Sequence, residues 1–441
     1  MSGHDSLFYG SVPDPVFAER IKMSSNKPRP AKPSKNRTRD QYETFPYPAR
    51  NAGEEDSRLI VGSPGNWGEV VHYVFGGRDP SQDGIPLRIL VAGGGTGDAG
   101  VMLAQQAQDR GVAAEIVYVD LSTASRAIAE ARIARRGLDN VTFVTGSFVD
   151  LAAELGPFDY IDCCGVLHHL PDPDAGLRAL AAALKPSGGM GLMVYGELGR
   201  IGVYHMQDMM NRLSAAAGGR KRLELGKEVF AGLPATNWLK RNPFVNDHIQ
   251  GGDAGFYDLL LHQQDRAYRV DEVFDFVEQA GLRLQGFIEP MRYDPLTYAS
   301  SPAIRKAVAR LDFRGQAALA ELMVGNLAKH IFYVVRADNP ARPTVLDGNA
   351  VPYWGRIDGA VLTASIAKNN QVKVNLNGLS VTCPLPVGTA EIIAQIDGVR
   401  SIAQIRKSMQ PVPDKKDFTA RFDGIYRVLS GANLLFLRAG A

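Results

Sequence analysis

The stretch "LRILVAGGGTGDAG", residues 87–100, decides the fold class, because an apolar run leads directly into glycines and then into a helical pattern. Its first seven residues predict a buried strand, and residues 99–111 predict a helix that ends at Gly111. A Gly-x-Gly-x-Gly turn lets a ligand approach the main chain, but dinucleotide, nucleoside and sulfonium ligands all use such turns. The residues that follow must therefore identify the ligand.

Strands and helices alternate beyond this motif. Further strands are predicted at 115–121, 141–147, 158–167 and 190–196. Helices are predicted at 123–137 and in 174–189, where Pro186 and two glycines stop the helix. Such alternation with short connections predicts an α/β fold, in which a parallel sheet carries helices on both faces. Ligands of such sheets bind at the carboxyl ends of the strands, where the strand order reverses. The pattern resumes later, with a helix at 270–281 and strands at 282–290 and 329–336.

The chain divides into segments of different composition. Residues 22–39 hold seven Lys or Arg, three Pro and no acid, which predicts a disordered basic tail, with RNA or an acidic partner as the alternative. Residues 40–50 concentrate aromatic side chains, and the prolines at 46 and 48 predict a stiff extended ribbon. The expected segments are a tail at 1–39, an N-terminal lid at 40–84, a core at 85–198, a helical cap insertion at 199–269, a completion of the core at 270–338 with a second insertion at 291–328, and a separate α+β domain at 350–441.

The overall composition excludes several classes of protein. The 441 residues are 45% hydrophobic and carry a net charge of +2, which is typical of a soluble protein and gives no reason to expect nucleic-acid or membrane binding. The three cysteines include one adjacent pair, so they cannot all form internal disulfides, and a cytoplasmic location is expected. The sequence has no apolar run of transmembrane length.

The residue at the end of the second predicted strand favours one kind of ligand. A carboxylate at Asp120 can accept hydrogen bonds from both hydroxyls of a ribose. A pyrophosphate would favour a basic residue beside the glycines, whereas Asp98 stands there. The turn therefore disfavours a pyrophosphate and tolerates the ammonium group of a sulfonium cofactor.

In their order and spacing, residues 87–100, 117–122, 140–147 and 158–196 resemble the successive motifs of class I S-adenosylmethionine-dependent methyltransferases. The resemblance implies a Rossmann-like seven-stranded sheet with helical cap insertions, a transferase activity (methylation) and S-adenosylmethionine as cofactor. The resemblance covers roughly residues 85–200 and reaches about residue 336 with the two late strands. No "[DN]PP[FY]" motif, which marks members that methylate adenine or glutamine nitrogens, follows the fourth strand.

The same resemblance implies which residues hold the cofactor. The glycines would admit its methionine portion, and Asp120 would bind the ribose. Two positions depart from the family pattern: Val91 replaces the usual acid before the glycines, so that Asp98 becomes the candidate partner of the methionine ammonium, and Ser147 replaces the usual acid at the adenine. The expected cofactor contacts are Gly93, Gly94, Gly95, Thr96, Gly97, Asp98, Asp120, Leu121, Ser122, Ser147, Phe148, Cys164, Gly165 and Leu167.

His168 and Tyr195 are the candidate catalytic residues, as bases or as groups that orient the acceptor. Methyl transfer from a sulfonium is an in-line displacement, which needs alignment and desolvation, and needs a base only when the acceptor carries a proton. No metal site is expected, because His168 and His169 are chain neighbours whose side chains should point apart.

Polar residues of the cap and aromatic residues of the lid are candidates for acceptor binding. Asp258, His262 and Asp265 follow helical spacing and could share one helix face, turned either to solvent or to the substrate. The ribbon at 40–50 would fold over the cofactor or pack in the core. The expected substrate contacts are Tyr42, Tyr47, Asp258, His262 and Arg266.

The C-terminal domain bears on the nature of the acceptor. Residues 342–441 hold twelve Lys or Arg against seven Asp or Glu, and residues 383–405 resemble the winged-helix-like module that ends rickettsial-type protein-lysine methyltransferases. Such a module would bind a polypeptide acceptor or form a homodimer; RNA binding and a purely structural role stay open. We expect a protein side chain as the acceptor. The alternatives are a small molecule and, because of Val91 and Ser147, a non-catalytic module that only binds the cofactor.

Overall fold

A computed structural model describes residues 35–80, 84–214 and 218–440. Its centre is a seven-stranded sheet of β1 (Leu87–Ala92), β2 (Ala114–Asp120), β3 (Val141–Thr145), β4 (Phe158–Cys164), β5 (Leu184–Tyr195), β6 (Leu282–Phe287) and β7 (Lys329–Arg336). The strand order is β3-β2-β1-β4-β5-β7-β6. Because β7 is antiparallel to β5 and β6, the sheet is mixed, and the expectation of a parallel sheet is corrected at this edge. The order reverses between β1 and β4, where a ligand site is expected.

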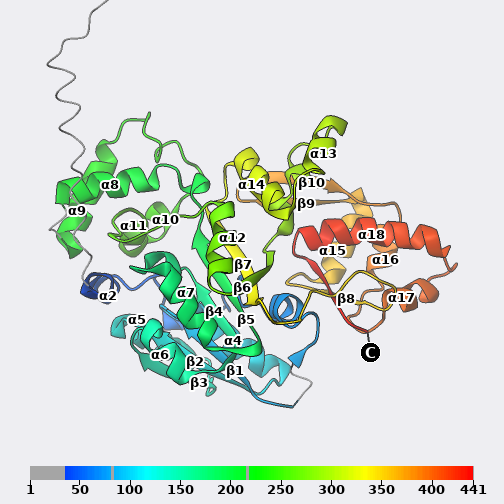
Figure 1. The fold of residues 1–441 in the computed structure, drawn as a ribbon, viewed down its shortest axis with the longest axis horizontal. Helices are drawn as coiled ribbons and strands as arrows, with labels where there is room; N and C mark the ends of the chain where they lie inside the picture. The colour runs from blue at the N-terminus through cyan, green and yellow to red at the C-terminus, as the bar shows by residue number, and fades with distance from the viewer. Residues whose placement is uncertain (1–34, 81–83, 215–217, 441) are drawn as a thin grey trace, which may run out of the picture.

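Helices cover both faces of this sheet (Figure 1). One face is covered by α3 (Trp67–Glu69), η2 (Val70–Val74), α4 (Asp98–Arg110) and α5 (Thr123–Arg135). The other is covered by α6 (Phe148–Leu155), α7 (Pro173–Ala182), α12 (Val270–Gln279) and α14 (Phe313–Val324). Successive strand residues point to opposite faces, so that Val91 of β1 packs in the first apolar core and Leu90 in the second. This three-layer arrangement confirms the predicted Rossmann-like fold.

Two expected boundaries are wrong. The helix predicted at 174–189 ends at Ala182, and Pro186 lies inside β5. Proline disfavours helical backbone at the residue before it, so the chain is already extended at Lys185. The lid predicted at 40–84 is only partly a lid, because residues 67–74 are buried beneath the sheet.

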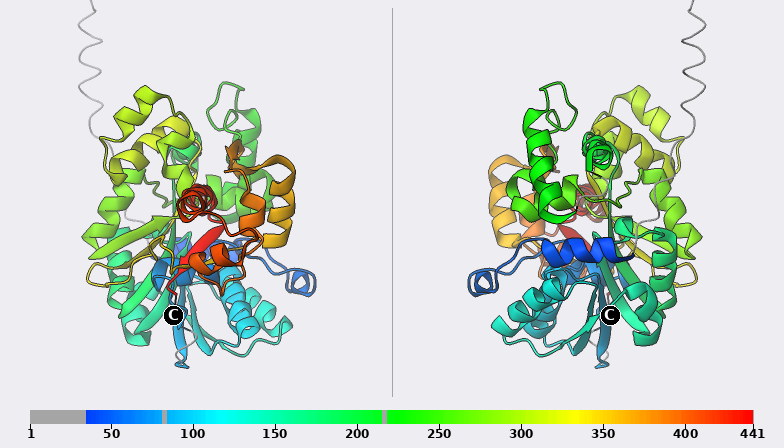
Figure 2. Two further views of the ribbon diagram at one scale, coloured as in Figure 1. Left: turned by 90° about the vertical axis from the view of Figure 1, so that its right-hand side faces the viewer. Right: turned by 90° about the vertical axis from the view of Figure 1, so that its left-hand side faces the viewer.

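The cap lies over the carboxyl edge of the sheet and has its own apolar core. It consists of α8 (Val203–Ser214), α9 (Gly219–Gly232), α10 (Asp247–Gln250) and α11 (Gly252–Leu260). The helix α2 (Lys35–Thr44) lies between the cap and the sheet (Figure 2), and the ring of Phe45 stacks on Tyr257 with 4.9 Å between centroids. The ribbon and tail predictions are therefore corrected, because residues 35–44 are helical and the chain then bends at Tyr47 and Pro48. Residues 1–34 of the predicted tail lie outside the described residues.

The C-terminal domain packs beside the sheet on an apolar core of its own (Figure 1). It contains β8 (Val351–Trp354), α15 (Gly359–Asn369), β9 (Gln371–Leu376), β10 (Leu379–Pro384), α16 (Thr389–Ile393), α17 (Ile402–Ser408), α18 (Lys415–Gly431) and β11 (Leu435–Arg438). Buried Glu69 accepts a hydrogen bond from Asn433 at 2.8 Å, and Tyr73 donates to Asn433 at 3.1 Å, so the domain is fixed to the core. In the described part of the chain, no helix is long and apolar enough to cross a membrane.

Candidate active site

A cavity of about 830 Å³ lies between the carboxyl ends of the central strands and the cap. Its volume is within the range of ligand sites, roughly 300–1,000 Å³. The glycine turn after β1 forms one wall, and Asp258 of α11 lies in the opposite wall. Of the expected cofactor contacts, those that line the cavity are Gly93, Gly94, Gly95, Asp98, Asp120, Leu121, Ser147, Phe148, Cys164 and Gly165.

Four expected cofactor contacts lie elsewhere, and their roles are corrected. Thr96 and Ser122 are fully buried; the first bonds to the N-terminal segment and the second caps α5. Gly97 has a φ of 100°, and a Cβ there would lie 2.8 Å from the Cβ of Ala129, so it serves the close approach of α4 and α5. Leu167 packs in the apolar core.

Asp120 joins the glycine turn to the end of β2. One carboxylate oxygen accepts a hydrogen bond from the Gly95 amide at 2.8 Å, and the other accepts from the Ser122 amide at 2.8 Å. Burial raises the pKa of Asp120, although these amides oppose the shift. No ion pair neutralises Asp120 among the described residues, and its carboxylate lines the cavity. The lone pairs that remain can accept from a ligand's hydroxyl groups.

The N-terminal segment crosses the glycine turn. The Thr96 hydroxyl donates to the Pro48 carbonyl at 2.7 Å. At Gly95, whose φ is 53°, a Cβ would lie 3.0 Å from the Tyr47 carbonyl oxygen, so the two main chains meet closely. The Tyr47 side chain lines the cavity together with Asp258. This segment therefore covers the turn and reaches the cap.

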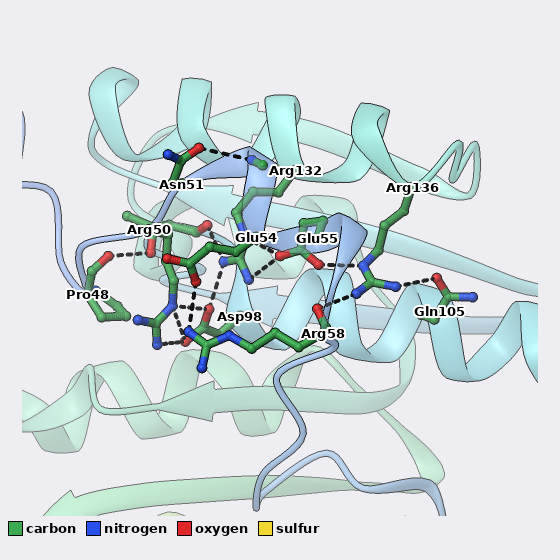
Figure 3. Close-up of polar contacts among 12 residues, drawn as sticks. Pro48, Arg50, Asn51, Glu54, Glu55, Arg58, Asp98, Gln105, Arg132 and Arg136 are labelled. Atoms are coloured by element: carbon green, nitrogen blue, oxygen red, sulfur yellow. Dashed lines mark hydrogen bonds and ion pairs between the residues drawn. The ribbon is translucent and has the colours of Figure 1, made fainter.

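A buried ion network holds this segment in place (Figure 3). Arg132 of α5, with a side chain 1% exposed, donates to Glu55 and Asp98, each at 2.7 Å. Arg50 donates to the same Asp98 at 2.6 Å. Burial would raise the pKa of Asp98, but the hydrogen bonds and charges of the two arginines lower it overall. Asp98 is thus neutralised within the protein, which argues against its expected role as the ammonium partner.

Releasing this segment is expected to weaken cofactor binding. Thr96→Val removes the hydroxyl that donates to Pro48, and one hydrogen bond contributes about 0.5–1.5 kcal/mol, or roughly a 2- to 13-fold loss of affinity for S-adenosylhomocysteine. Calorimetric titration measures this loss. Thr363→Val is the matched control, because its hydroxyl donates to a carbonyl inside α15, away from the cavity, at 2.6 Å. Equal affinities of the Thr96 variant and the control would contradict the role of this contact.

The far end of the cavity is rich in tyrosine and acid. Asp258, 3% exposed, lies 2.9 Å from the Tyr42 hydroxyl and 3.4 Å from the Tyr195 hydroxyl, which donate to its two oxygens. Burial raises the pKa of Asp258. The guanidinium of Arg200 lies 3.4 Å from the centre of the Tyr195 ring and pairs with Asp265, not with Asp258.

The two ends of the cavity differ in chemistry. At the strand end, half-buried Asp120 and buried Asp162 lack ion-pair partners within the described ranges and lie beside a turn of bare main chain. These groups fit a ligand that carries hydroxyl groups and a cationic group. Its hydroxyls would donate hydrogen bonds to the carboxylates, and its positive charge would balance their negative charge.

Comparisons with known proteins bear on the family and the fold of this chain. Residues 90–190 match the family model described as "Methyltransferase domain". The O-methyltransferase of ubiquinone biosynthesis from Chromobacterium violaceum is 33% identical over 93 residues, which cover 21% of this chain and 39% of that enzyme. The structure titled PKMT2 from Rickettsia typhi in complex with AdoHcy has a TM-score of 0.56 at 16% identity, over 86% of this chain and 76% of that chain, and it shares the fold.

The chain belongs to the class I S-adenosylmethionine-dependent methyltransferases. S-adenosylmethionine is its cofactor. An uncharacterised protein of Synechococcus is 33% identical over 305 residues, which cover 68% of this chain and 71% of that protein. Similarity to that protein thus extends well beyond the methyltransferase domain at residues 90–190.

The methyltransferase places His169, rather than the expected His168, at the cavity. His168 is 1% exposed, its ring packs 3.8 Å from that of Tyr195, and neither ring nitrogen has a hydrogen-bond partner among the described residues. The side chains do not point apart as expected, because both residues belong to the 3-10 helix η4 (Leu167–His169), and their ring centroids are 4.3 Å apart. His168 therefore supports Tyr195 from behind.

The argument against a metal site also needs correction. His169, His262 and Asp258 are buried and offer ligand atoms within 4.8 Å of one another. The two imidazole rings are stacked, however, with 3.9 Å between centroids and 22° between planes. Nδ1 of each ring also lies within hydrogen-bond distance of Gln264, at 3.3 Å for His169 and 3.1 Å for His262.

The expected substrate contacts divide into two groups. Tyr42, Tyr47 and Asp258 line the cavity, whereas His262 lies behind His169. The expected common helix face is wrong, because α11 ends at Leu260 before His262. Arg266 is exposed and pairs with Glu272 at 3.2 Å, outside the cavity. Cavity residues outside the expected contacts include Asp162, His169, Arg200, Phe244, Asn246, Asp247, Gln250 and, from the C-terminal domain, Asn377.

Proposed function

We propose that this methyltransferase transfers the methyl group to an amine on a protein side chain, as in lysine. The observation that carries the proposal is Asp258, a buried carboxylate with no ion pair in the described part of the chain and with tyrosines around it. A buried carboxylate is stabilised by a cation, and tyrosine rings attract ammonium groups through their faces. An aliphatic ammonium group satisfies both requirements.

The same residues supply what amine methylation requires. An ammonium group must lose a proton before its nitrogen can attack, so an amine acceptor needs a base. Asp258 is the base that we propose, because burial raises its pKa and the hydroxyls of Tyr42 and Tyr195 orient its oxygens. When bound, S-adenosylmethionine supplies an electrophilic methyl group. Tyr195 would also orient the acceptor.

The C-terminal domain supports a polypeptide acceptor. Asn377, at the turn between β9 and β10, lines the cavity. Asn326 donates to the carbonyl of Leu376 at 2.8 Å, and Asn377 donates to the carbonyl of Asn326 at 2.9 Å, so the hairpin is anchored at the mouth. A peptide would thus contact the cap and this domain together. A small amine is the alternative, because the cavity could hold such a molecule beside the cofactor.

Labelling of a cell lysate distinguishes these acceptors. The full-length enzyme is incubated with lysate and S-adenosylmethionine tritiated at the methyl group, and protein, RNA and small molecules are then separated. We expect label in protein and methylated lysine after hydrolysis. Label confined to small molecules would instead establish the alternative, and label in RNA would contradict both.

Asp258→Asn is expected to reduce methyl transfer by at least about 100-fold, since a positioned general base contributes 10²–10⁴-fold. The affinity of this variant for S-adenosylhomocysteine should stay within about 3-fold of that of the unaltered protein, because Asp258 lines the end of the cavity where we propose that the acceptor binds. Asp208→Asn on the exposed face of α8 is the matched control and should leave both quantities unchanged. Full activity of the Asp258 variant would rule out this base.

We also propose a cytoplasmic location. The three cysteines are free in the structure, and Cys163 and Cys164 lie on β4 at the methyltransferase core. Unpaired cysteines are typical of reducing compartments.

A further inference from the structure

The strand that lacks the family's usual acid has an acidic residue directly beside it. Val91 of β1 is the register partner of Asp162 on β4, and the two strands are parallel. Paired residues of adjacent parallel strands point to the same face, so the Asp162 carboxylate lies on the face where the side chain at position 91 points. Both residues line the cavity together with Gly93.

Asp162 is a buried carboxylate without a cation. It is 1% exposed, and no ion pair reaches it from the described residues. Its Oδ2 accepts a hydrogen bond from the Tyr160 hydroxyl at 3.2 Å. Burial raises the pKa of Asp162 to about 7. A carboxylate in this state is costly to ionise, and a cationic ligand group would remove that cost.

Other acids near the glycine turn already have partners or other tasks. Asp98 is held by two arginines, and Glu289 is paired with Arg292. Asp120 lies on the opposite side of β1, at the end of β2, where it bonds to the turn. Asp162 is therefore the carboxylate that remains at the reversal of strand order, between β1 and β4.

We propose that Asp162 binds the α-ammonium group of S-adenosylmethionine, in place of the acid that the family usually carries before the glycines. The carboxylate has moved by one strand, from β1 to β4, without leaving the face of the sheet. This inference concerns the cofactor and does not depend on the nature of the methyl acceptor.

Two ligands that differ by one group test the proposal. Calorimetry with the full-length protein compares S-adenosylhomocysteine with its des-amino analogue, which lacks only the ammonium group. Asp162→Asn is expected to lower the affinity for S-adenosylhomocysteine by about 30-fold or more, because it removes one partner of a buried charge pair. The affinity for the des-amino analogue should change by less than about 3-fold. Asp159→Asn is the control on the same strand, because Asp159 pairs with Lys185 outside the cavity.

A second variant, in which the acid is moved back to β1, tests the proposal even if Asp162→Asn alters packing. Val91→Asp combined with Asp162→Val returns the acid to β1. We expect it to bind S-adenosylhomocysteine more tightly than Asp162→Asn, with thermal melting confirming that both variants fold. An equal loss for both ligands in Asp162→Asn, or no loss for either, would overturn the assignment, as would a transposed variant that folds and binds no better.

Discussion

Asp120→Ala is expected to abolish measurable binding of S-adenosylmethionine and S-adenosylhomocysteine. The Asp120 carboxylate holds the amides of Gly95 and Ser122 and, in our proposal, accepts the ribose hydroxyls as well. Hydrogen bonds to a charged group contribute about 1.5–3 kcal/mol each, so losing two to the ribose alone would cost about 100-fold or more in affinity. Calorimetric titration with S-adenosylhomocysteine measures the loss.

The fold should survive this change. Asp120 stands at the last residue of β2, and its loss removes no apolar packing from either core. Thermal unfolding of Asp120→Ala should therefore remain cooperative. Asp139→Ala, at an exposed position before β3, is the matched control and should bind like the unaltered protein. Unchanged affinity of the Asp120 variant would refute the placement of the ribose.

Arg132→Met is expected to lower the free energy of unfolding by about 3–5 kcal/mol, because it removes one partner of a buried ion network. The buried Glu55 carboxylate would lose the guanidinium 2.7 Å away, and Asp98 would lose one of its two arginines. Urea-induced unfolding followed by circular dichroism measures the change. S-adenosylhomocysteine should also bind more weakly, since the segment at 47–58 would detach from the glycine turn.

Arg135→Met is the matched control for this experiment. Arg135 lies one turn further along α5 and pairs with Asp56, but its side chain is 54% exposed. The urea midpoint of this variant should stay near that of the unaltered protein, because exposed ion pairs contribute little. If the two variants unfolded alike, the network at Arg132 would have no special role.

The sheet and the strand end of the cavity could be predicted because their signals are local. An apolar strand, a glycine turn and an acid at the end of the next strand are contiguous patterns, and Gly93, Gly95 and Asp120 all line the cavity. The positions at which helices end were predicted less accurately. Residues 184–189 follow a helical pattern, yet they form the first half of β5, in which Leu184 pairs with Phe158 and Gly189 with Tyr160.

The other end of the cavity could be predicted only in part. Tyr42, Tyr47 and Asp258 line it as expected, whereas its remaining residues come together only through tertiary structure. His168 and His169 differ in role only because η4 turns the second ring to the cavity. The sequence shows Asp162 only as an acid within an apolar strand, and its place beside Val91 becomes apparent only from the strand pairing. Asn377 belongs to another domain, and nothing in its local sequence indicates a cavity residue.

A crystal structure of the protein with S-adenosylhomocysteine tests the central claim most directly. We expect the ribose hydroxyls within hydrogen-bond distance of Asp120, the ammonium group beside Asp162, and the sulfur directed toward Asp258 and Tyr195. A ligand bound outside this cavity, or one whose sulfur points away from Asp258, would contradict the proposed site.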